Sequence, residues 1–455
     1  MKTRMNFKDE FYQKLKLLVL PIAIQNFMLA LVSATDAIML GWIDQTSLSA
    51  VSLAGQVQFV LSLFISGIAA GAGIMAAQYW GKRDAASIEK VIPIALRTNL
   101  LFSGLFTILA GFCPEILMRI FTNDAALVAS GSQYLRAVAL SYVLCGISQV
   151  YLILLKNTGH AAVSSRISST AVVLNIILNA ILIYGLCGAP ALGIRGAAYA
   201  TVAALFLELI WAYLETKKPE RVRILWNRLF SSAGKILSED FWRYTLPVLA
   251  ASLVWGIAYV LYSVIMGHMG SDAVAANSIT SIAKSLLSCL IRGVSGGAGV
   301  LIGNLLGANE LEKAREYGGR LSHLSIAIGI VTGGLLMLIS PAIVHFAPLS
   351  DTAAEYLQYM LLFCGLNLMA QSVNTTVLDG IFCAGGDAKF DMQGNIGAMW
   401  CFSVPLGFLA AFWLKLPVMV VYCIVNLDEI VKIPAVYHHY KKYIWVRNIT
   451  RDVED

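Results

Sequence analysis

Charged residues are scarce in this sequence. Asp, Glu, Lys and Arg make up 13% of its 455 residues and hydrophobic residues 58%, whereas soluble globular proteins contain about 25% charged residues. A water-soluble surface cannot be built from this composition. The sequence therefore excludes a soluble globular protein and indicates a membrane protein.

Signatures of soluble enzymes are also missing. The sequence has no Walker A loop, no His-rich metal pattern and no nucleophile elbow. Its eight cysteines occur singly, with neither metal-ligand spacing nor a disulfide framework, so we interpret them as packing residues. No loop is long enough for a nucleotide-binding domain, so energy for any transport has to come from an ion gradient or a partner. We expect neither an enzyme nor a cofactor.

Long apolar blocks are abundant, and they predict twelve transmembrane helices. A spanning helix needs about 20 apolar residues and satisfies its own backbone hydrogen bonds, and no alternation typical of a β-barrel is present. The predicted spans are 15–42, 50–78, 91–113, 133–156, 163–186, 193–215, 241–268, 276–305, 318–346, 354–384, 390–414 and 416–440. The predicted fold class is therefore an all-α integral membrane protein.

Basic residues are distributed unevenly between the loops. Most lie in five segments on one side: Lys2 to Lys16, Lys82 to Lys90, Lys217 to Arg243, Lys313 to Arg320 and Lys441 to Arg451. The alternate loops hold chiefly Arg119, Arg195 and Lys415. By the positive-inside rule, this asymmetry predicts a multi-pass protein of the cell (inner or plasma) membrane with both termini in the cytoplasm. Because the basic residues follow topology, we expect the lipid bilayer as a partner and no nucleic acid.

The chain aligns with itself without gaps at an offset of 226 residues, where Pro21 pairs with Pro247. Two halves of six spans in the same orientation are parallel repeats, so we predict two pseudo-symmetric six-helix bundles. The predicted domains are an N-terminal lobe (1–216), a basic cytoplasmic linker (217–240), a C-terminal lobe (241–440) and a cytoplasmic tail (441–455). Both halves carry a GxxxG pair, Gly67 with Gly71 and Gly293 with Gly297, which favours close helix packing.

Asp36 is the outstanding polar residue of the first half, because it lies deep in the apolar segment "MLALVSATDAIMLG". A carboxylate at that depth costs a few kcal/mol unless it is paired, protonated or facing water, so it is a functional candidate. Pro21, fifteen residues earlier, breaks the hydrogen-bond ladder of the same predicted helix and would let it bend.

Polar residues on two later spans of the first half are candidate partners of Asp36. Asn175 and Asn179 lie one turn apart on one face of span 163–186, and Thr201 adds a hydroxyl on span 193–215. Together the four side chains offer hard oxygen ligands for a sodium ion, or hydrogen bonds to an ionised acid. Taken alone, the amides and the hydroxyl are equally consistent with interhelical hydrogen bonds.

The second half carries Lys284, Arg292 and Asp379 within its predicted spans. A basic pair eight residues apart on roughly one face would bind or repel charged substrate, or neutralise Asp379 in an internal salt bridge; both interpretations stay open. Glu208, Asp428 and Glu429 lie nearer the basic ends of their spans, so we expect them to snorkel toward the interface.

These features together resemble the multidrug and toxic compound extrusion family of secondary transporters. The resemblance covers nearly the whole chain and is carried by the order and duplication of its motifs. They are "SATDAIMLG" with the preceding Pro21, "GAGIMAAQYWGKRD", "KNTGHA", "LNIILNAILIYG", "GIRGAAYATV", "GAGVLIGNLLGANE" and "IFCAGGDAKF".

The resemblance implies two six-helix lobes in a V, alternating access, and export of bulky, often cationic and amphipathic compounds in exchange for sodium or protons. It implies that Asp36 is a cation-coupling residue with Asn175, Asn179 and Thr201 around it. Asn179 stands where some members have a second acid, and Trp255 and Ser372 stand near the places where others have acids in the C-terminal lobe. Coupling through that lobe is therefore not expected.

We expect small-molecule substrates, chiefly organic cations, and a monomeric protein. The predicted substrate cavity is lined by Gln25, Met28, Lys284, Arg292 and Asp379.

The nearest alternative function is a flippase or exporter of lipid-linked oligosaccharides, which only Lys284 and Arg292 favour. A membrane-embedded transferase would need a catalytic cluster, but His160, His323, His438 and His439 are dispersed. A channel would conduct without counter-ion stoichiometry. The natural substrate and the choice between sodium and protons cannot be read from the sequence.

Overall fold

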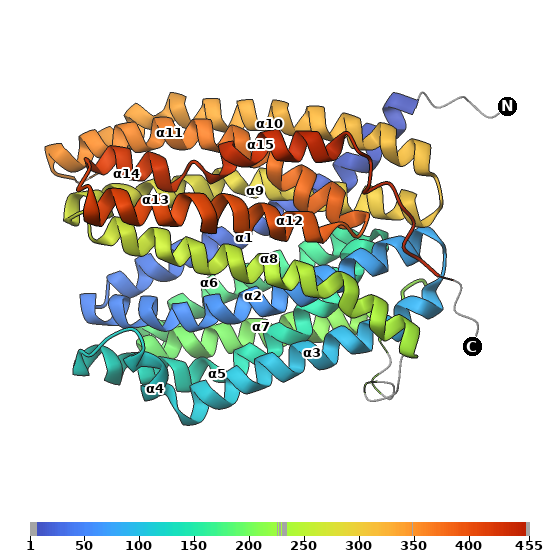
Figure 1. The fold of residues 1–455 in the computed structure, drawn as a ribbon. Helices are drawn as coiled ribbons and strands as arrows, with labels where there is room; N and C mark the ends of the chain where they lie inside the picture. The colour runs from blue at the N-terminus through green and yellow to red at the C-terminus, as the bar shows by residue number, and fades with distance from the viewer. Residues whose placement is uncertain (1–6, 225, 227–228, 230–233, 348, 452–455) are drawn as a thin grey trace. The chain divides into compact units, whose positions relative to one another are not determined.

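A computed structural model of the chain describes residues 7–224, 226, 229, 234–347 and 349–451. These residues are almost entirely helical, and no strand occurs among them. The helices of the first half are α1 (Phe7–Gly41), α2 (Gln45–Gly81), α3 (Ala85–Phe112), α4 (Pro114–Arg119), α5 (Ala125–Leu155), α6 (Ala161–Tyr184) and α7 (Ile194–Thr216) (Figure 1).

The second half begins with long helices and ends with broken ones. Its helices are α8 (Lys235–Gly267), α9 (Ser271–Gly307), α10 (Leu311–Phe346) and α11 (Asp351–Thr375), which continues as the π-helix η4 (Thr376–Phe382). The eleventh predicted span is a series of short segments, namely α12 (Ala388–Asn395), η5 (Ile396–Ser403), α13 (Val404–Phe408) and η6 (Leu409–Trp413). The twelfth is two helices, α14 (Val418–Val425) and α15 (Asp428–Tyr440).

Ten apolar segments among the described residues are long enough to cross a membrane. One of them, Ala125–Tyr184, contains two predicted spans, because α5 and α6 are joined by the π-helix η1 (Lys156–His160). Gly159 turns the chain there with a φ of +82°, a conformation that glycine adopts without strain. The twelfth span consists of two helices too short to count singly. The predicted all-α, twelve-helix membrane fold is confirmed.

The chain divides into two compact units. One, here called the C-terminal unit, contains the chain through Asn26 together with Ala250–Arg451; the other, the N-terminal unit, contains Phe27–Leu249. Both boundaries lie within helices, in α1 and in α8, at nearly equivalent places of the repeat. The lobe boundaries drawn from the sequence stay a prediction. Residues 1–6, 225, 227–228, 230–233 and 452–455 of the predicted lobe, linker and tail lie outside the described residues.

The GxxxG glycine of α2 makes room for the beginning of α8 within the N-terminal unit. A Cβ atom added to Gly71 would lie 2.3 Å from Thr245 Oγ1 and 2.7 Å from Thr245 Cα, so the two helices touch. Gly67 meets Leu249 of α8 in the same way. The predicted close packing is therefore present, and the helix that packs against the α2 glycines is α8, the first helix of the second half of the sequence.

The equivalent contact occurs in the C-terminal unit. A Cβ atom added to Gly293 of α9 would lie 2.9 Å from Ala23 Cα, and one added to Gly297 would lie 2.8 Å from Val19 Cγ2. These partners on α1 are related to Leu249 and Thr245 by the same offset as the glycines themselves. The repeat therefore extends from sequence to helix packing.

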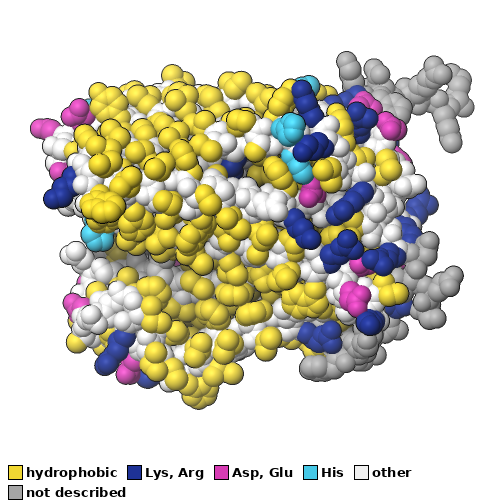
Figure 2. Space-filling view, viewed as in Figure 1, with side chains coloured by type: hydrophobic (Ala, Val, Ile, Leu, Met, Phe, Trp, Pro, Cys, Tyr) yellow, Lys and Arg dark blue, Asp and Glu magenta, His cyan; other side chains and the backbone are white. Residues whose placement is uncertain are grey.

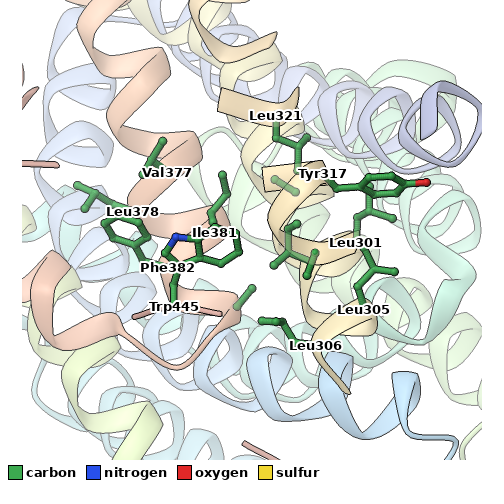
Figure 3. Close-up of a cluster of buried hydrophobic side chains, with 14 of the residues drawn as sticks. Leu301, Leu305, Leu306, Tyr317, Leu321, Val377, Leu378, Ile381, Phe382 and Trp445 are labelled. Atoms are coloured by element: carbon green, nitrogen blue, oxygen red, sulfur yellow. The ribbon is translucent and has the colours of Figure 1, made fainter. Parts of the chain in front are cut away.

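Each unit has its own hydrophobic core. In the N-terminal unit, Leu40 of α1, Leu61 of α2 and Tyr142 of α5 belong to one buried cluster. In the C-terminal unit, Figure 3 shows side chains of α9, α10 and η4 around Trp445, whose indole is fully buried. The segment after α15, predicted as a tail, thus packs into this core.

Each unit, taken by itself, displays a largely apolar surface along the middle of its helices. Figure 2 shows hydrophobic side chains there and most Lys and Arg side chains toward one end. Lipid-facing side chains account for exposed residues such as Leu101 and Leu338. This surface is that of a multi-pass membrane protein.

Candidate functional site

The last two turns of α1 bring Asp36 against α6. The Asn179 side-chain amide donates a hydrogen bond from Nδ2 to Asp36 Oδ1 at 2.6 Å. Close by, the Tyr184 hydroxyl donates to the Met39 carbonyl oxygen at 2.7 Å. These two bonds tie the end of α1 to α6, so the Asp36 carboxylate is held in one place within the N-terminal unit.

A ladder of side-chain hydrogen bonds continues from Asp36 along α6 to α7. Asn179 Nδ2 also donates to Asn175 Oδ1 at 3.1 Å, and Asn175 Nδ2 donates to Thr201 Oγ1 at 3.3 Å. The Thr201 hydroxyl in turn donates to the Ala197 carbonyl oxygen at 3.0 Å. The structure therefore brings together all four predicted coupling residues, here called the Asp36 cluster: Asp36, Asn175, Asn179 and Thr201.

Neutral groups dominate the surroundings of Asp36. Asn179 is fully buried and Asn175 nearly so, whereas Asp36 is half-buried. Among the described residues, no Lys or Arg side chain pairs with Asp36. Asn179 Oδ1 is buried and has no hydrogen-bond partner in the described part of the chain. A carboxylate without a counter-charge and an unsatisfied amide oxygen together suit a cation that comes and goes.

The other residues predicted on α1 lie nearer its beginning. The helix runs without interruption through Pro21, which is half-buried and cannot donate a backbone hydrogen bond. Gln25 and Met28 are both half-buried, and they lie on either side of the boundary between the two units. The bending role of Pro21 and the cavity roles of Gln25 and Met28 stay predictions.

The basic residues of α9 have different partners in the C-terminal unit. Lys284 donates from Nζ to Asn367 Oδ1 of α11 at 3.1 Å, and Asn367 Nδ2 donates to the Asn426 carbonyl oxygen at 2.6 Å. Asn426 lies at the break between α14 and α15. Arg292 and Asp379 both have exposed side chains and lie within electrostatic reach of each other. Asp379 also lies within electrostatic reach of Asp391, Glu429 and Lys432. The cavity roles of Lys284, Arg292 and Asp379 stay predictions.

The expectation that Glu208 and Asp428 snorkel toward the interface is wrong. Glu208 is 5% exposed and accepts a hydrogen bond from Ser148 of α5, while Asp428 is 6% exposed and lies 3.6 Å from the Lys432 ammonium group. Glu429 is partly buried and lies 3.4 Å from Lys432. These acids face neighbouring helices instead of lipid, which a position along the span cannot show.

Several of these partners were not foreseen from the sequence. Lys432 is 5% exposed and pairs with two acids, and Asn374 Nδ2 donates to Glu429 Oε2 at 2.8 Å. The sequence does contain a signal for a polar contact on this helix. Asn367 and Asn374 are seven residues apart within an apolar span and so share one face. Tyr184 gave no such signal, because tyrosine is common at membrane interfaces.

Comparison with known protein families identifies the family of this chain. The MatE family model matches the chain twice, over residues 21–181 and 247–409. The chain belongs to the MatE family. Both matches begin at the prolines that open the internal repeat, so the repeat found in the sequence is the repeat of the family.

Curated relatives span nearly the whole MatE chain. An uncharacterized transporter of Bacillus subtilis, YisQ, is 21% identical over 94% of this chain and 93% of its own length. A protein of Thermotoga maritima described as probable multidrug resistance protein NorM is 23% identical, covering 90% of this chain and 87% of its own length. The chain is thus a transporter of the multidrug and toxic compound extrusion family, as its motifs predicted.

Solved structures share the fold of this MatE chain. A transporter of the MOP superfamily from Pyrococcus furiosus superposes with a TM-score of 0.85 at 19% identity and covers 95% of both chains. A MATE crystal structure in the bent conformation gives a TM-score of 0.85 at 18% identity, and one in the straight conformation 0.84 at 20%. At this identity the likeness supports the fold alone.

Proposed function

We propose that this MatE chain is a secondary antiporter that exports bulky, mostly cationic or amphipathic compounds in exchange for a proton or a sodium ion. The observation that carries the proposal is the contact between Asp36 and Asn179 within a cluster that holds no cationic side chain among the described residues. The naming of several relatives as probable multidrug resistance proteins supports the substrate class.

Asp36 would alternate between a cation-loaded and an ionised state. A bound cation shifts a conformational equilibrium only if it binds the two conformations differently. The half-buried Asp36 meets this condition, because a change in its access to water changes the cost of its charge. Loading from outside would bend α1 near Pro21 and release substrate outward. One charge crossing 100 mV contributes about 2.3 kcal/mol, enough to bias such a switch.

The chemistry of the cluster fits either cation. A proton would bind to the Asp36 carboxylate, and the amide groups would adjust their hydrogen bonds to the neutral acid. A sodium ion would use hard oxygen atoms of Asp36, Asn175, Asn179 and Thr201, of which Asn179 Oδ1 has no hydrogen-bond partner among the described residues.

The remaining features of the proposal concern sidedness and assembly. We place the basic loops and both termini in the cytoplasm of the cell inner or plasma membrane, on the asymmetry of Lys and Arg residues. The protein acts as a monomer on small molecules and catalyses no chemical reaction. Of the two residues that favour the flippase alternative, Lys284 donates a hydrogen bond to Asn367, while Arg292 keeps an exposed side chain.

Transport by the purified protein in liposomes tests the proposal. A proton gradient and a sodium gradient are imposed separately, and ethidium serves as the cationic probe. We expect one of the two gradients to drive ethidium transport and Asp36→Asn to abolish it. Asp351→Asn removes an exposed acid at the start of α11 and is the matched control. Full gradient-driven transport by Asp36→Asn would overturn the assignment.

A further inference from the structure

A column of polar side chains runs along one face of α7. Thr201, Glu208 and Glu215 follow one another at seven-residue spacing, which keeps them on nearly the same face of a helix. Successive members are about 10 Å apart along the helix axis. Thr201 belongs to the Asp36 cluster, and Glu215 lies one residue before the end of α7.

The far end of the column is an ion-pair site next to the basic loop. Glu215 is 6% exposed, and its carboxylate lies 2.7 Å from Lys218 Nζ and 3.1 Å from the Arg221 guanidinium. Lys218 is 60% exposed, so this end of the column meets water. Glu208 is therefore midway between the Asp36 cluster and an aqueous surface.

The neighbouring helix α6 supplies polar groups in register with the column. Asn175 contacts Thr201, and seven residues earlier Ser168 hydrogen-bonds to Glu208. Because α6 and α7 run antiparallel, seven residues back on α6 match seven residues forward on α7. Ser148 of α5 donates the other hydrogen bond to the Glu208 carboxylate.

The surroundings of Glu208 contain no compensating charge. Among the described residues no Lys, Arg or His side chain pairs with it. From α5 it faces Ser148 and the Cys145 thiol, and the only charged residue of α6, Arg166, is exposed. Burying an ionised carboxylate among neutral groups is costly. A packing role alone does not require an acid here, because a neutral polar side chain could accept the Ser148 hydrogen bond without the cost of a buried charge.

We propose that Glu208 is a second proton-binding site of the transport cycle, midway between the Asp36 cluster and the aqueous end of α7. The proposal rests on the proposed function, in which Asp36 is the coupling residue, and takes the proton as the coupling ion. In one step, water carries the proton lost by Asp36 to the Glu208 carboxylate, forming one O–H bond as another breaks. In the next, Glu208 gives the proton to water beside Glu215 and becomes ionised again.

The gap between the two sites keeps this route closed in the structure. Buried Ala171 and Val172 of α6 and Ala204 of α7 fill the two turns between Thr201 and Glu208. An open proton path from Asp36 to the basic end would dissipate the gradient. Transfer therefore needs the helices to separate enough to admit water, which ties it to the conformational cycle.

Infrared difference spectroscopy of the full-length protein in lipid tests the proposal directly. Spectra recorded between acidic and alkaline pH report carboxylic acids that titrate. We expect Glu208→Gln to lose one titrating carboxylic C=O band and Asp36→Asn to keep that band. An unchanged spectrum for Glu208→Gln would overturn the proposal, because it would mean that Glu208 stays in one protonation state.

Transport in liposomes provides the second measurement. We expect Glu208→Gln to slow proton-driven ethidium transport by about tenfold or more, since a positioned proton acceptor typically contributes at least this much. Glu208→Asp should restore part of the rate, and Glu220→Gln, which removes an exposed acid of the basic loop, should not change it. Gel filtration and thermal unfolding establish that each variant is folded.

The outcomes separate this proposal from the proposed function. If Asp36→Asn transports normally, the proposed function fails, whatever Glu208 does. If Asp36→Asn is inactive while Glu208→Gln is fully active, only the role of Glu208 fails.

If Glu208→Gln does not fold, Ser148→Ala is measured in its place. Loss of the hydrogen bond that Ser148 donates should move the infrared band of Glu208 to a higher titration pH. An unmoved band contradicts the proposal. Transport driven by sodium alone also overturns it.

Discussion

The two halves of the chain share their backbone plan but differ in their polar side chains. When the halves are aligned at the offset of 226 residues, the glycines of the GxxxG pairs align with each other. Asp36, however, aligns with Tyr262, and the helix cap Asp44 aligns with Gly270. Around Asp36 the N-terminal unit has amides and a hydroxyl, whereas the C-terminal unit has an ion-pair network around Lys432.

This difference shows that the repeat preserves packing and leaves chemistry free to diverge. Glycines at helix crossings must stay small in both halves because the backbones touch there. An acid needs no counterpart, because one cation-binding site is enough to couple a gradient to a conformational change. Substitutions at equivalent positions of the two halves test this difference in polar side chains, and the largest effect is expected at Asp36.

Substitutions at the aligned positions Asp36 and Tyr262 should affect transport very differently. We expect Asp36→Asn to abolish ion-driven ethidium transport in liposomes, because the cation loses its carboxylate. Tyr262→Phe should keep more than about half of the rate, because it removes only a neutral hydroxyl from a buried side chain. Equal loss in both variants would mean that the halves are functionally symmetric.

Removing the buried cation of the C-terminal unit should destabilise the protein strongly. Lys432→Met leaves Asp428 and Glu429 beside each other without their ammonium partner, and breaking a buried pair typically costs about 3–5 kcal/mol. Lys235→Met, which removes an 89% exposed lysine of α8, is the control and should have little effect. Thermal unfolding in detergent measures both; similar melting temperatures would show that the network is not structural.

The equivalent glycines Gly71 and Gly297 should tolerate alanine differently. A Cβ atom at position 71 meets the backbone of Thr245, whereas at 297 its nearest neighbour is a side-chain methyl of Val19. We expect Gly71→Ala to cost about 1–3 kcal/mol and Gly297→Ala less. Gly104→Ala on α3, where nothing lies within 4 Å, serves as the control in thermal unfolding. A smaller loss at 71 than at 297 would contradict the packing described.

The smallest effect is expected at the caps of the equivalent helices α2 and α9, of which only α2 has a side-chain cap. Asp44 accepts hydrogen bonds from Ser47 N and Ser47 Oγ, both at 2.7 Å, and these bonds lower the pKa of Asp44. A carboxylate with a lowered pKa stabilises the fold above its ordinary pKa and loses that contribution as the pH falls through the lowered value.

Asp44→Ala should therefore reduce the melting temperature slightly near neutral pH, and the difference from the wild type should shrink in acid. Gly270→Ala changes the equivalent cap of α9, which has no side-chain hydrogen bond, but its φ of +108° makes any side chain strained. Its effect should accordingly not vary with pH. A pH-independent difference for Asp44→Ala would contradict the capping role.

The sequence by itself determined the spans, the repeat and the candidate coupling acid. All twelve predicted spans coincide with helical segments to within about eight residues at their ends, because apolar length and backbone hydrogen bonding leave a membrane chain few choices. Asp36 stood out because an acid is costly in an apolar span. Asn175, Asn179 and Thr201 were found because polar residues on one helix face are a local, periodic signal.

Only the tertiary structure decided which groups face each other. The GxxxG glycines receive helices of the opposite half, and the acids predicted to snorkel are buried against Ser148 and Lys432. Such contacts join residues far apart in the chain, and the orientation of a side chain toward lipid or toward protein depends on how helices rotate when they pack. Hydropathy records how deep a residue lies, and only the packed structure shows what surrounds it.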